Sequence, residues 1–320
     1  MWCCSTRTLS LLRHVRKDFS LIHNTKRSFR VKSLNINGGE SGTGNSAGTL
    51  IKPFLFTLGF GATTLAAVSI WQYENIRGVF HSKTTIDIFN RKSQKYGELR
   101  REINHLWNQL SPGEKVFVPI FCLNLAVTLM WQIRRFEGSI MRRYFLSDPR
   151  SSNKCFPLFL SSFSHNSFLH FAVNMFVLHS FCDGIVRALG KEQFVGVYLT
   201  AGVVSGFVSL VTKVLLNTSA PSLGASGCIC AVLGLFGTLN PNSLMQIVFI
   251  PGFTFTASTA IKGLITLDTA GLLMGWKVFD HAAHLGGTLF GIWWATYGGK
   301  LIWQKREKFI TWWHENVRSK

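Results

Sequence analysis

Apolar runs that are almost free of charged residues follow one another along most of the chain. Each run is close to the roughly 20 residues that a helix needs to cross a bilayer, where a helix satisfies its backbone hydrogen bonds internally. The pattern predicts seven spans, at residues 53–71, 116–133, 156–181, 194–212, 222–239, 253–275 and 281–299. They group as one plus six, so the expected fold is an all-α membrane protein in which one extra transmembrane helix precedes a six-helix core.

Polar segments between the spans carry patterns of their own. Leu99, Ile103, Leu106 and Leu110 recur with the period of an amphipathic helix. The sequence SPGE at residues 111–114 can cap the helix that follows, with Ser at the N-cap, Pro at the first helical position and Glu at the third. The predicted segments are a leader and linker (1–52), the extra transmembrane helix (53–73), an amphipathic linker (74–115), the six-helix core (116–299) and a basic aromatic tail in the membrane interface (300–320).

Composition and charge narrow the class of protein. Of the 320 residues, 47% are hydrophobic and 15% charged, which is more apolar side chain than one soluble core of that length requires. The net charge of +19 lies outside the apolar runs, so we expect no nucleic-acid partner. The seven cysteines form no CxxC pair, which argues against a disulfide scaffold or a zinc ribbon.

The first 52 residues have the composition of a mitochondrial transit leader. They contain nine Lys or Arg against only Asp18 and Glu40, with repeated Ser and no apolar run of signal-peptide length. Residues 35–49 are rich in Gly, Ser and Asn and are predicted to be a flexible linker. The alternative interpretation is a basic tail without a targeting role.

Three polar clusters lie within the predicted spans, where polar side chains usually serve function or helix pairing. The third span carries His165, His170 and Asn174, and the last two share a helix face because they are four residues apart. The fifth span opens with SLGASG at residues 222–227, and the seventh opens with DHAAHLGG at residues 280–287.

The glycines near these clusters favour close contact between helices. Gly287 and Gly291 form a small-xxx-small face, which lets another backbone approach closely. Such an approach is what Ser226 and His284 need in order to reach hydrogen-bonding distance, roughly 2.6 to 3.2 Å.

Each cluster alone also has a plainer explanation. Small residues are common at helix crossings, and a histidine in a membrane can be a proton relay, a metal or haem ligand, or a packing residue. His281 and His284 could bind a metal, but there is no HExxH motif and no cluster that completes a zinc site. Cys228 occupies the last position of the GxSxG motif of soluble hydrolases. We expect neither a metal nor a cofactor.

Together the three clusters resemble the signatures of the rhomboid intramembrane serine proteases. That family has HxxxxHxxxN on its second core helix, GxSG at the start of the fourth, and AHxxG with a further glycine four residues on in the sixth. Here the patterns read from His165 to Asn174, from 224 to 227, and from 283 to 287 with Gly291, in that order. The leader and the extra helix are similar to the mitochondrial branch of the family.

The resemblance implies a role for each matching residue. Ser226 would be the nucleophile and His284 the general base, without a third acidic member; Asp280, one turn before His284, is an alternative orienting group. The residues implied to stabilise the oxyanion are His170 and Asn174, and those implied to support the site are His165, Gly224, Gly227, Gly287 and Gly291.

Some positions depart from the pattern of bacterial relatives. Cys230 stands where those proteins often have a tyrosine that packs on the histidine, and RRY at residues 142–144 stands where they have Trp-Arg. In the family the fifth core helix is the lateral gate, and here that span contains Lys262 and Asp268, which could also simply contact each other.

The implied function is a serine endopeptidase in the mitochondrial inner membrane, with several spans, which cleaves single-span membrane proteins near helix-destabilising residues. Its partners would be these substrates and the lipid bilayer; the sequence identifies no other protein partner. One alternative is an inactive rhomboid-like scaffold or chaperone, which would usually lack Ser226 or His284. Another is a proton-coupled transporter, for which pseudo-symmetric halves are expected and are not found.

Overall fold

The computed structural model describes residues 47–84, 97–133, 137–246 and 252–319. The chain divides into two units, Met1–Thr43 and Gly44–Lys320. The first unit, and with it most of the predicted leader and linker, lies outside the described residues. The described residues all belong to the second unit.

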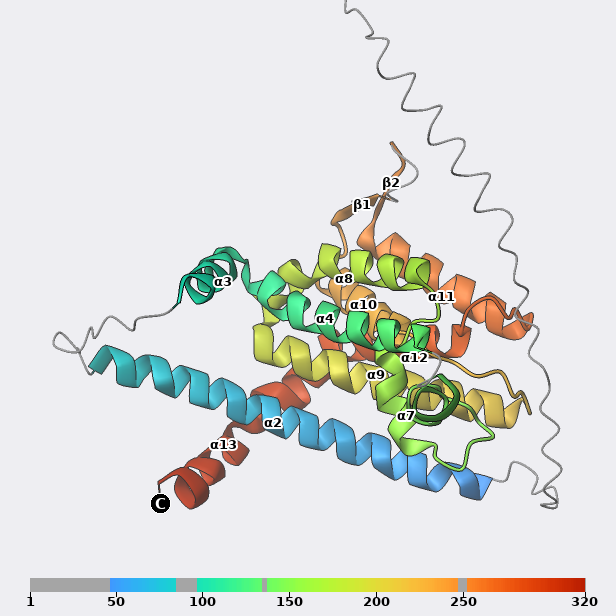
Figure 1. Ribbon diagram of the computed structural model, residues 1–320, viewed down its shortest axis with the longest axis horizontal. Coiled ribbons are helices and arrows are strands. Elements are labelled where there is room, and N and C mark those ends of the chain that lie inside the picture. The colour runs from blue at the N-terminus through green and yellow to red at the C-terminus, as the bar shows by residue number, and fades with distance from the viewer. Residues whose placement is uncertain (1–46, 85–96, 134–136, 247–251, 320) are drawn as a thin grey trace, which may run out of the picture. The chain divides into compact units, whose positions relative to one another are not determined.

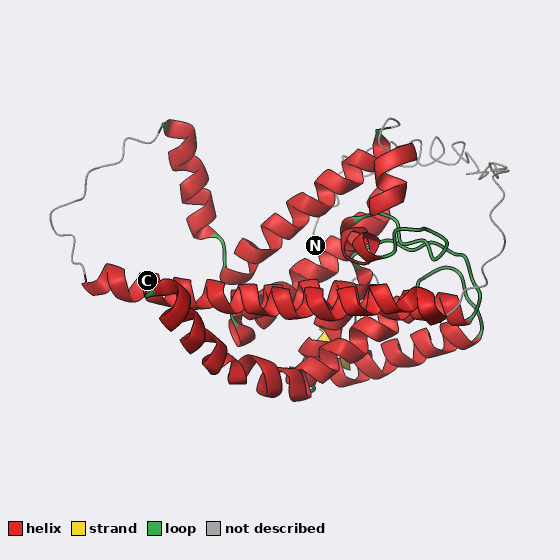
Figure 2. Cartoon of the chain, turned by 90° about the horizontal axis from the view of Figure 1, so that it is seen from below, coloured by secondary structure: helices red, strands yellow, loops and turns green. Residues whose placement is uncertain are grey.

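The described residues are almost entirely helical, as predicted (Figure 1, Figure 2). The longer helices are α2 (Ile51–Thr84), α3 (Glu98–Gln109), α4 (Pro112–Gln132), α8 (Phe168–Leu189), α9 (Lys191–Leu215), α10 (Ser226–Leu239), α11 (Ala257–Leu273) and α12 (His281–Trp293). Shorter helical segments are η1 (Ala47–Leu50), η2 (Glu137–Met141), α6 (Arg142–Tyr144), α7 (Cys155–Leu160), η3 (Ser161–Phe163), η4 (Trp294–Trp303), η5 (Gln304–Arg306), α13 (Glu307–Trp313) and η6 (His314–Arg318). One antiparallel hairpin pairs β1 (Leu244–Gln246) with β2 (Thr254–Thr256).

Helix length separates two groups among the predicted spans. Within the described residues, the helices long and apolar enough to cross a membrane are Gly48–Val79, Pro112–Gln132, Phe168–Leu189 and Lys191–Leu215. By contrast, α10, α11 and α12 have 14, 17 and 13 residues. Helices therefore occur at all seven predicted positions, and four of them are both long and apolar enough to qualify as spans by themselves. The chain is an all-α membrane protein, with one small hairpin among its described residues.

The predicted third span is not one continuous helix. The chain leaves η3 after Phe163 and enters α8 at Phe168, where the Ser167 hydroxyl accepts a hydrogen bond from the His170 amide at 3.2 Å. A capping side chain of this kind satisfies an amide that has no partner within the helix. His165 consequently lies in the loop before the helix rather than on it.

Two other predicted helix starts are displaced. The predicted fifth span begins as a helix at Ser226 rather than at residue 222, and the predicted sixth span begins at Ala257 because its first residues form β2. Thr256 caps α11 by accepting a hydrogen bond from the Thr259 amide at 3.3 Å. The predicted cap of α4 is confirmed, since Ser111 and Glu114 form a reciprocal capping box.

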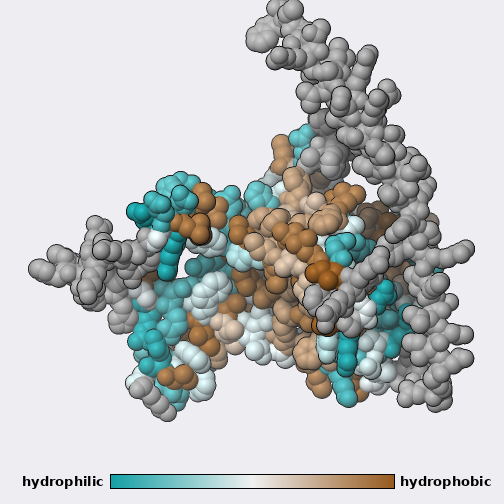
Figure 3. Space-filling view, viewed as in Figure 1, coloured by the Kyte–Doolittle hydropathy of each residue, from teal (hydrophilic) through white to brown (hydrophobic). Residues whose placement is uncertain are grey.

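Helix α10 lies at the centre of the bundle and packs against α8, α9, α11 and α12. The main hydrophobic core forms among α8, α9, α10 and η4; its most deeply buried large side chains include Leu178, Ile185, Phe194, Tyr198, Leu235 and Trp294. Helix α2 packs on α9, and α4 packs on α8. Other apolar side chains remain exposed, as on α8, where Leu169 is 75% exposed, and Figure 3 shows apolar residues gathered over the middle of the bundle. Exposed apolar side chains on such helices suit a lipid environment.

Candidate active site

Ser226 is the first residue of α10, and backbone hydrogen bonds hold the loop that precedes it. Gly224 has a φ of +130°, a backbone conformation that glycine adopts far more easily than other residues. Its amide donates a hydrogen bond to the Ser161 carbonyl at 2.9 Å, while Ser147 and Ser222 form an isolated antiparallel bridge. The start of α10 is thereby held against the segment that precedes α8.

His284 lies in the first turn of α12, whose start is anchored by Asp280. The Asp280 carboxylate accepts a hydrogen bond from the Ala283 amide at 3.1 Å, and from α9 it accepts bonds from Ser209 at 2.6 Å and Lys213 at 2.7 Å. Burial raises the pKa of Asp280, but the charge of Lys213 and the hydrogen bonds from Lys213, Ser209 and Ala283 together outweigh it, so the pKa lies below its ordinary value. Asp280 therefore fixes the helix start, whereas the sequence had offered it as an orienting group for the ring.

Glycine residues bring α10 and α12 into backbone contact. A Cβ atom added at Gly287 would collide with the Gly227 carbonyl, and one added at Gly291 would collide with the Ala231 carbonyl. This crossing carries the predicted small-residue face of α12. The His284 Nε2 atom lies 2.9 Å from the Ser226 Oγ atom as a result.

Helix α8 carries His170 and Asn174, and His170 lies beside the loop that holds Ser226. A Cβ atom at Gly224 would lie 3.1 Å from His170 Nε2 and 3.8 Å from Ser226 Oγ, which places the His170 ring beside the serine loop. Asn174 is 6% exposed and donates one hydrogen bond to the His170 carbonyl at 2.8 Å. The structure therefore brings His170 beside the loop that leads to Ser226 and places Asn174 one turn along the same helix.

His165 is fully buried behind His170. The two rings meet edge to face with centroids 5.0 Å apart, and the His165 ring also meets Phe171 at 5.6 Å. Within the described part of the chain, both ring nitrogens of His165 and the Ser164 hydroxyl lack a hydrogen-bond partner. His165 thus packs against the His170 ring.

Sequence reasoning missed one residue of this site, Asp268 on α11. Its side chain is 2% exposed, and its Oδ1 atom lies 2.8 Å from His281 Nδ1 and 3.3 Å from His284 Nδ1. Lys262 is exposed on the same helix, so the buried carboxylate faces the histidines of α12 instead. The signal that could have revealed it is an ionisable carboxylate in the middle of a predicted span.

Phe279 is an aromatic neighbour of the His284 ring, whereas residue 230, where bacterial relatives often have a tyrosine, is a cysteine here. Phe279 lies beside the His284 ring with ring centroids 6.0 Å apart, and His281 lies at 6.4 Å. Cys230 is buried within α10. His284 is therefore bordered by residues that immediately precede or begin its own helix.

Known proteins match most of the chain. Residues 152–301 match the Rhomboid domain. The chain is 48% identical over 271 residues to the presenilin-associated rhomboid-like protein, mitochondrial, of Mus musculus, which covers 83% of this chain and 72% of that protein. The Homo sapiens protein of the same name is 47% identical, with 83% and 71% covered. Rhomboid protein 1, mitochondrial, of Saccharomyces cerevisiae is 31% identical over 190 residues, 58% of this chain and 54% of that protein.

Several apolar helices long enough to cross a membrane, together with relatives that are named mitochondrial, make this a multi-pass mitochondrial membrane protein. The family signatures occupy adjacent positions in its helical bundle. The chain belongs to the rhomboid family, with the mitochondrial presenilin-associated rhomboid-like proteins among its relatives.

Proposed function

We propose that this protein is a serine endopeptidase of the mitochondrial inner membrane that cleaves single-span membrane proteins with Ser226 and His284. The contact of 2.9 Å between His284 Nε2 and Ser226 Oγ carries the proposal. A nucleophile within hydrogen-bonding reach of a base is the geometry of covalent catalysis. Membership of a family that consists largely of intramembrane serine proteases supports the same conclusion.

The chemistry follows from this pair. His284 Nε2 accepts the proton of the Ser226 hydroxyl as Oγ attacks the carbonyl carbon of the substrate peptide. The protonated ring then gives that proton to the departing amine, which leaves an acyl-enzyme on Ser226. His284 next accepts a proton from water, the resulting hydroxide attacks the acyl carbon, and Ser226 regains its proton on release of the product.

The negative charge on the substrate oxygen needs donors that are already in place. The Ser226 amide at the start of α10 is one, since a helix N-terminus carries unpaired N–H groups. His170 lies beside the serine loop, and the Asn174 amide group has a second N–H beyond the one bonded to the His170 carbonyl. We assign these three donors to the oxyanion.

The remaining predicted residues support this arrangement through packing. Gly224 leaves room for the His170 ring, and Gly227 leaves room for the Ser205 side chain of α9. Gly287 and Gly291 allow the backbone approach between α10 and α12. His165 packs against the His170 ring.

A substrate must reach Ser226 as an extended strand, so helices that unwind readily near Gly, Pro or small residues are the expected substrates.

A serine-directed probe separates this proposal from an inactive scaffold and from a proton-coupled transporter. We expect a fluorophosphonate probe to label the full-length protein in detergent and Ser226→Ala to abolish the labelling. Ser180→Ala is the matched control, because Ser180 is exposed on α8 and bonded to the Phe176 carbonyl. Unchanged labelling of Ser226→Ala, or an unlabelled wild-type protein that cleaves no membrane substrate, would contradict the proposal.

Residues 1–52 are proposed to be the import leader of the protein. Their nine basic residues against two acidic ones carry this proposal. Fused to a fluorescent protein, these residues should direct it to mitochondria, and reversing the charge of the basic residues should prevent import. Cytosolic fluorescence of the unmodified fusion would refute the leader without affecting the proposed active site.

A further inference from the structure

The buried carboxylate of Asp268 lies between two histidines that belong to a different helix. Asp268 is on α11, while His281 and His284 are in the first turn of α12. A single oxygen, Oδ1, lies 2.8 Å from His281 Nδ1, with which it is hydrogen-bonded, and 3.3 Å from His284 Nδ1. Within the described residues, neither Asp268 Oδ2 nor His281 Nε2 has a hydrogen-bond partner.

This geometry selects a tautomer for each ring. A buried carboxylate requires donors, and here the Nδ1 atoms of both histidines lie within 3.3 Å of its Oδ1 atom. With its proton on Nδ1, the neutral His284 ring presents an unprotonated Nε2 atom toward Ser226. That is the form in which His284 can accept the serine proton.

The His281 ring also forms the contact between α11 and α12. Gly271 follows Asp268 by three residues and so lies on the same face of α11. A Cβ atom at Gly271 would collide with the His281 ring. Trp276 and Phe279 border that ring with centroids at 5.9 Å and 6.1 Å. His281 is therefore confined between Asp268, the glycine and two aromatic rings.

We propose that Asp268 and His281 are positioning residues, which hold His284 in its basic tautomer only while α11 is docked against α12. The inference rests on the proposed roles of Ser226 and His284. His281 holds the carboxylate in place, and the carboxylate stabilises the positive charge that His284 acquires when it takes the serine proton. Movement of α11 away from α12 would remove the carboxylate and leave His284 a weaker base.

Kinetics of the full-length protein in detergent, with a membrane-protein substrate, test this assignment. Asp268→Asn should lower kcat by about 10² or more with KM changed little, because loss of the corresponding carboxylate in a soluble serine protease lowers kcat by about 10⁴. The acid limb of the pH–rate profile should also move to lower pH, since the protonated His284 ring loses its counter-charge. Lys262→Gln, an exposed change on the same helix, should alter neither quantity.

A pair of His281 variants isolates its role. His281→Asn keeps an N–H group close to the position of Nδ1 and should retain most of the activity, whereas His281→Leu removes the donor and should lower kcat. Gly271→Ala should reproduce the loss seen in His281→Leu, because the added methyl group displaces the same ring.

The outcomes distinguish this inference from the proposed function. Wild-type kcat and pH profile in Asp268→Asn, with Ser226→Ala inactive on parallel preparations, would overturn the positioning role alone. Activity retained in Ser226→Ala would overturn the proposed function itself. If Asp268→Asn fails to fold, the His281 variants decide, and equal kcat values for His281→Leu and His281→Asn would overturn the inference.

Discussion

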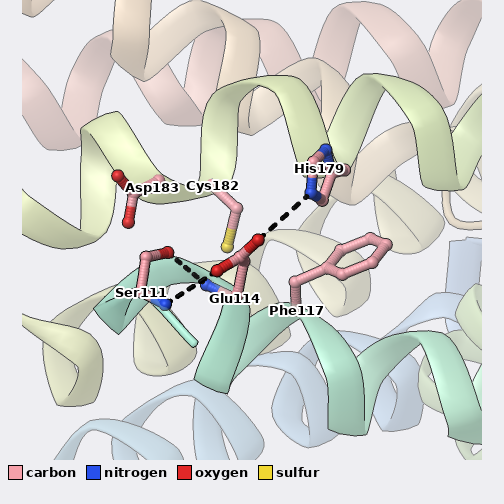
Figure 4. A pocket seen from close by; sticks show the side chains of 6 residues that line it. All are labelled: Ser111, Glu114, Phe117, His179, Cys182 and Asp183. Carbon is pink, nitrogen blue, oxygen red and sulfur yellow. Dashed lines mark hydrogen bonds and ion pairs between the residues drawn. The ribbon is translucent and has the colours of Figure 1, made fainter. Parts of the chain in front are cut away.

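Two polar clusters in this protein contain similar residue types and differ in burial. One surrounds Ser226 and His284. The other is a pocket of about 240 Å³ between α4 and α8, lined by Ser111, Glu114, Phe117, His179, Cys182 and Asp183 (Figure 4). In the pocket, His179 lies 4.0 Å from Glu114, and their side chains are 55% and 40% exposed. In the first cluster, His281 lies 2.8 Å from Asp268, with side chains 4% and 2% exposed.

The nucleophilic side chains of the two clusters also differ in their hydrogen-bond partners. In the pocket, the Ser111 hydroxyl accepts a hydrogen bond from the Glu114 amide at 3.1 Å, and the Cys182 thiol donates one to the Gly113 carbonyl at 3.4 Å. Both groups complete the backbone bonding at the start of α4. Ser226 Oγ instead faces a histidine base across a close helix crossing. Proximity of a histidine, an acid and a nucleophile therefore indicates chemistry only where the nucleophile is not already used by the backbone.

Removal of either proposed catalytic residue should have the largest effect. Ser226→Ala and His284→Ala should each lower kcat by about 10⁶, the scale of such losses in a soluble serine protease, and the double variant should be no worse because the residues act as one unit. Cleavage of a membrane substrate in proteoliposomes measures this. A double variant far less active than either single variant would show that the two residues do not act together.

Changes to the proposed oxyanion donors should have the next largest effect. His170→Ala and Asn174→Ala should each lower kcat by about 10² to 10³ and change KM much less, because the charge they stabilise exists only in the transition state. The competing interpretation is that these side chains only connect helices. It predicts a lower melting temperature with near-normal kcat, so both quantities are to be measured on the same preparations.

The close packing of α10 against α12 can be tested by adding a single methyl group at the crossing. Gly287→Ala should destabilise the protein by about 1–3 kcal/mol, the usual cost of overpacking, and should lower activity, because the new Cβ collides with the Gly227 carbonyl. Gly184→Ala on α8 is the matched control, since its Cβ would meet only Phe236 at 3.8 Å. Thermal unfolding in detergent compares the two. Equal melting temperatures would show that the crossing tolerates wider spacing.

The pocket between α4 and α8 should show the smallest effect. His179→Ala should leave kcat unchanged, because the ring packs on Phe117 and faces Glu114, away from the serine. Its exposed contact with Glu114 should change the free energy of unfolding by less than about 1 kcal/mol. A large loss of kcat would mean that the pocket contributes to the reaction and would remove the contrast between the two clusters.

The sequence by itself determined the helical class, the approximate helix positions and the residues that carry the proposed chemistry. Helices were readable because apolar runs and caps depend on residues that are close together in the chain. The capping box of Ser111 and Glu114 is an example, since its partners are three residues apart. Family signatures likewise lie within short segments, so Ser226, His284, His170 and Asn174 could be named before the fold was known.

Only the tertiary structure decided which polar groups meet across helices. Asp268 lies thirteen positions before His281, and nothing in that separation distinguishes a contact with His281 from one with Lys262. The packing of α11 on α12 at Gly271 buried the carboxylate against two histidines. The break before α8 and the hairpin before α11 also depended on loop bonding. Contacts within a helix follow from its period, whereas contacts between helices depend on the side-chain volumes at their crossing.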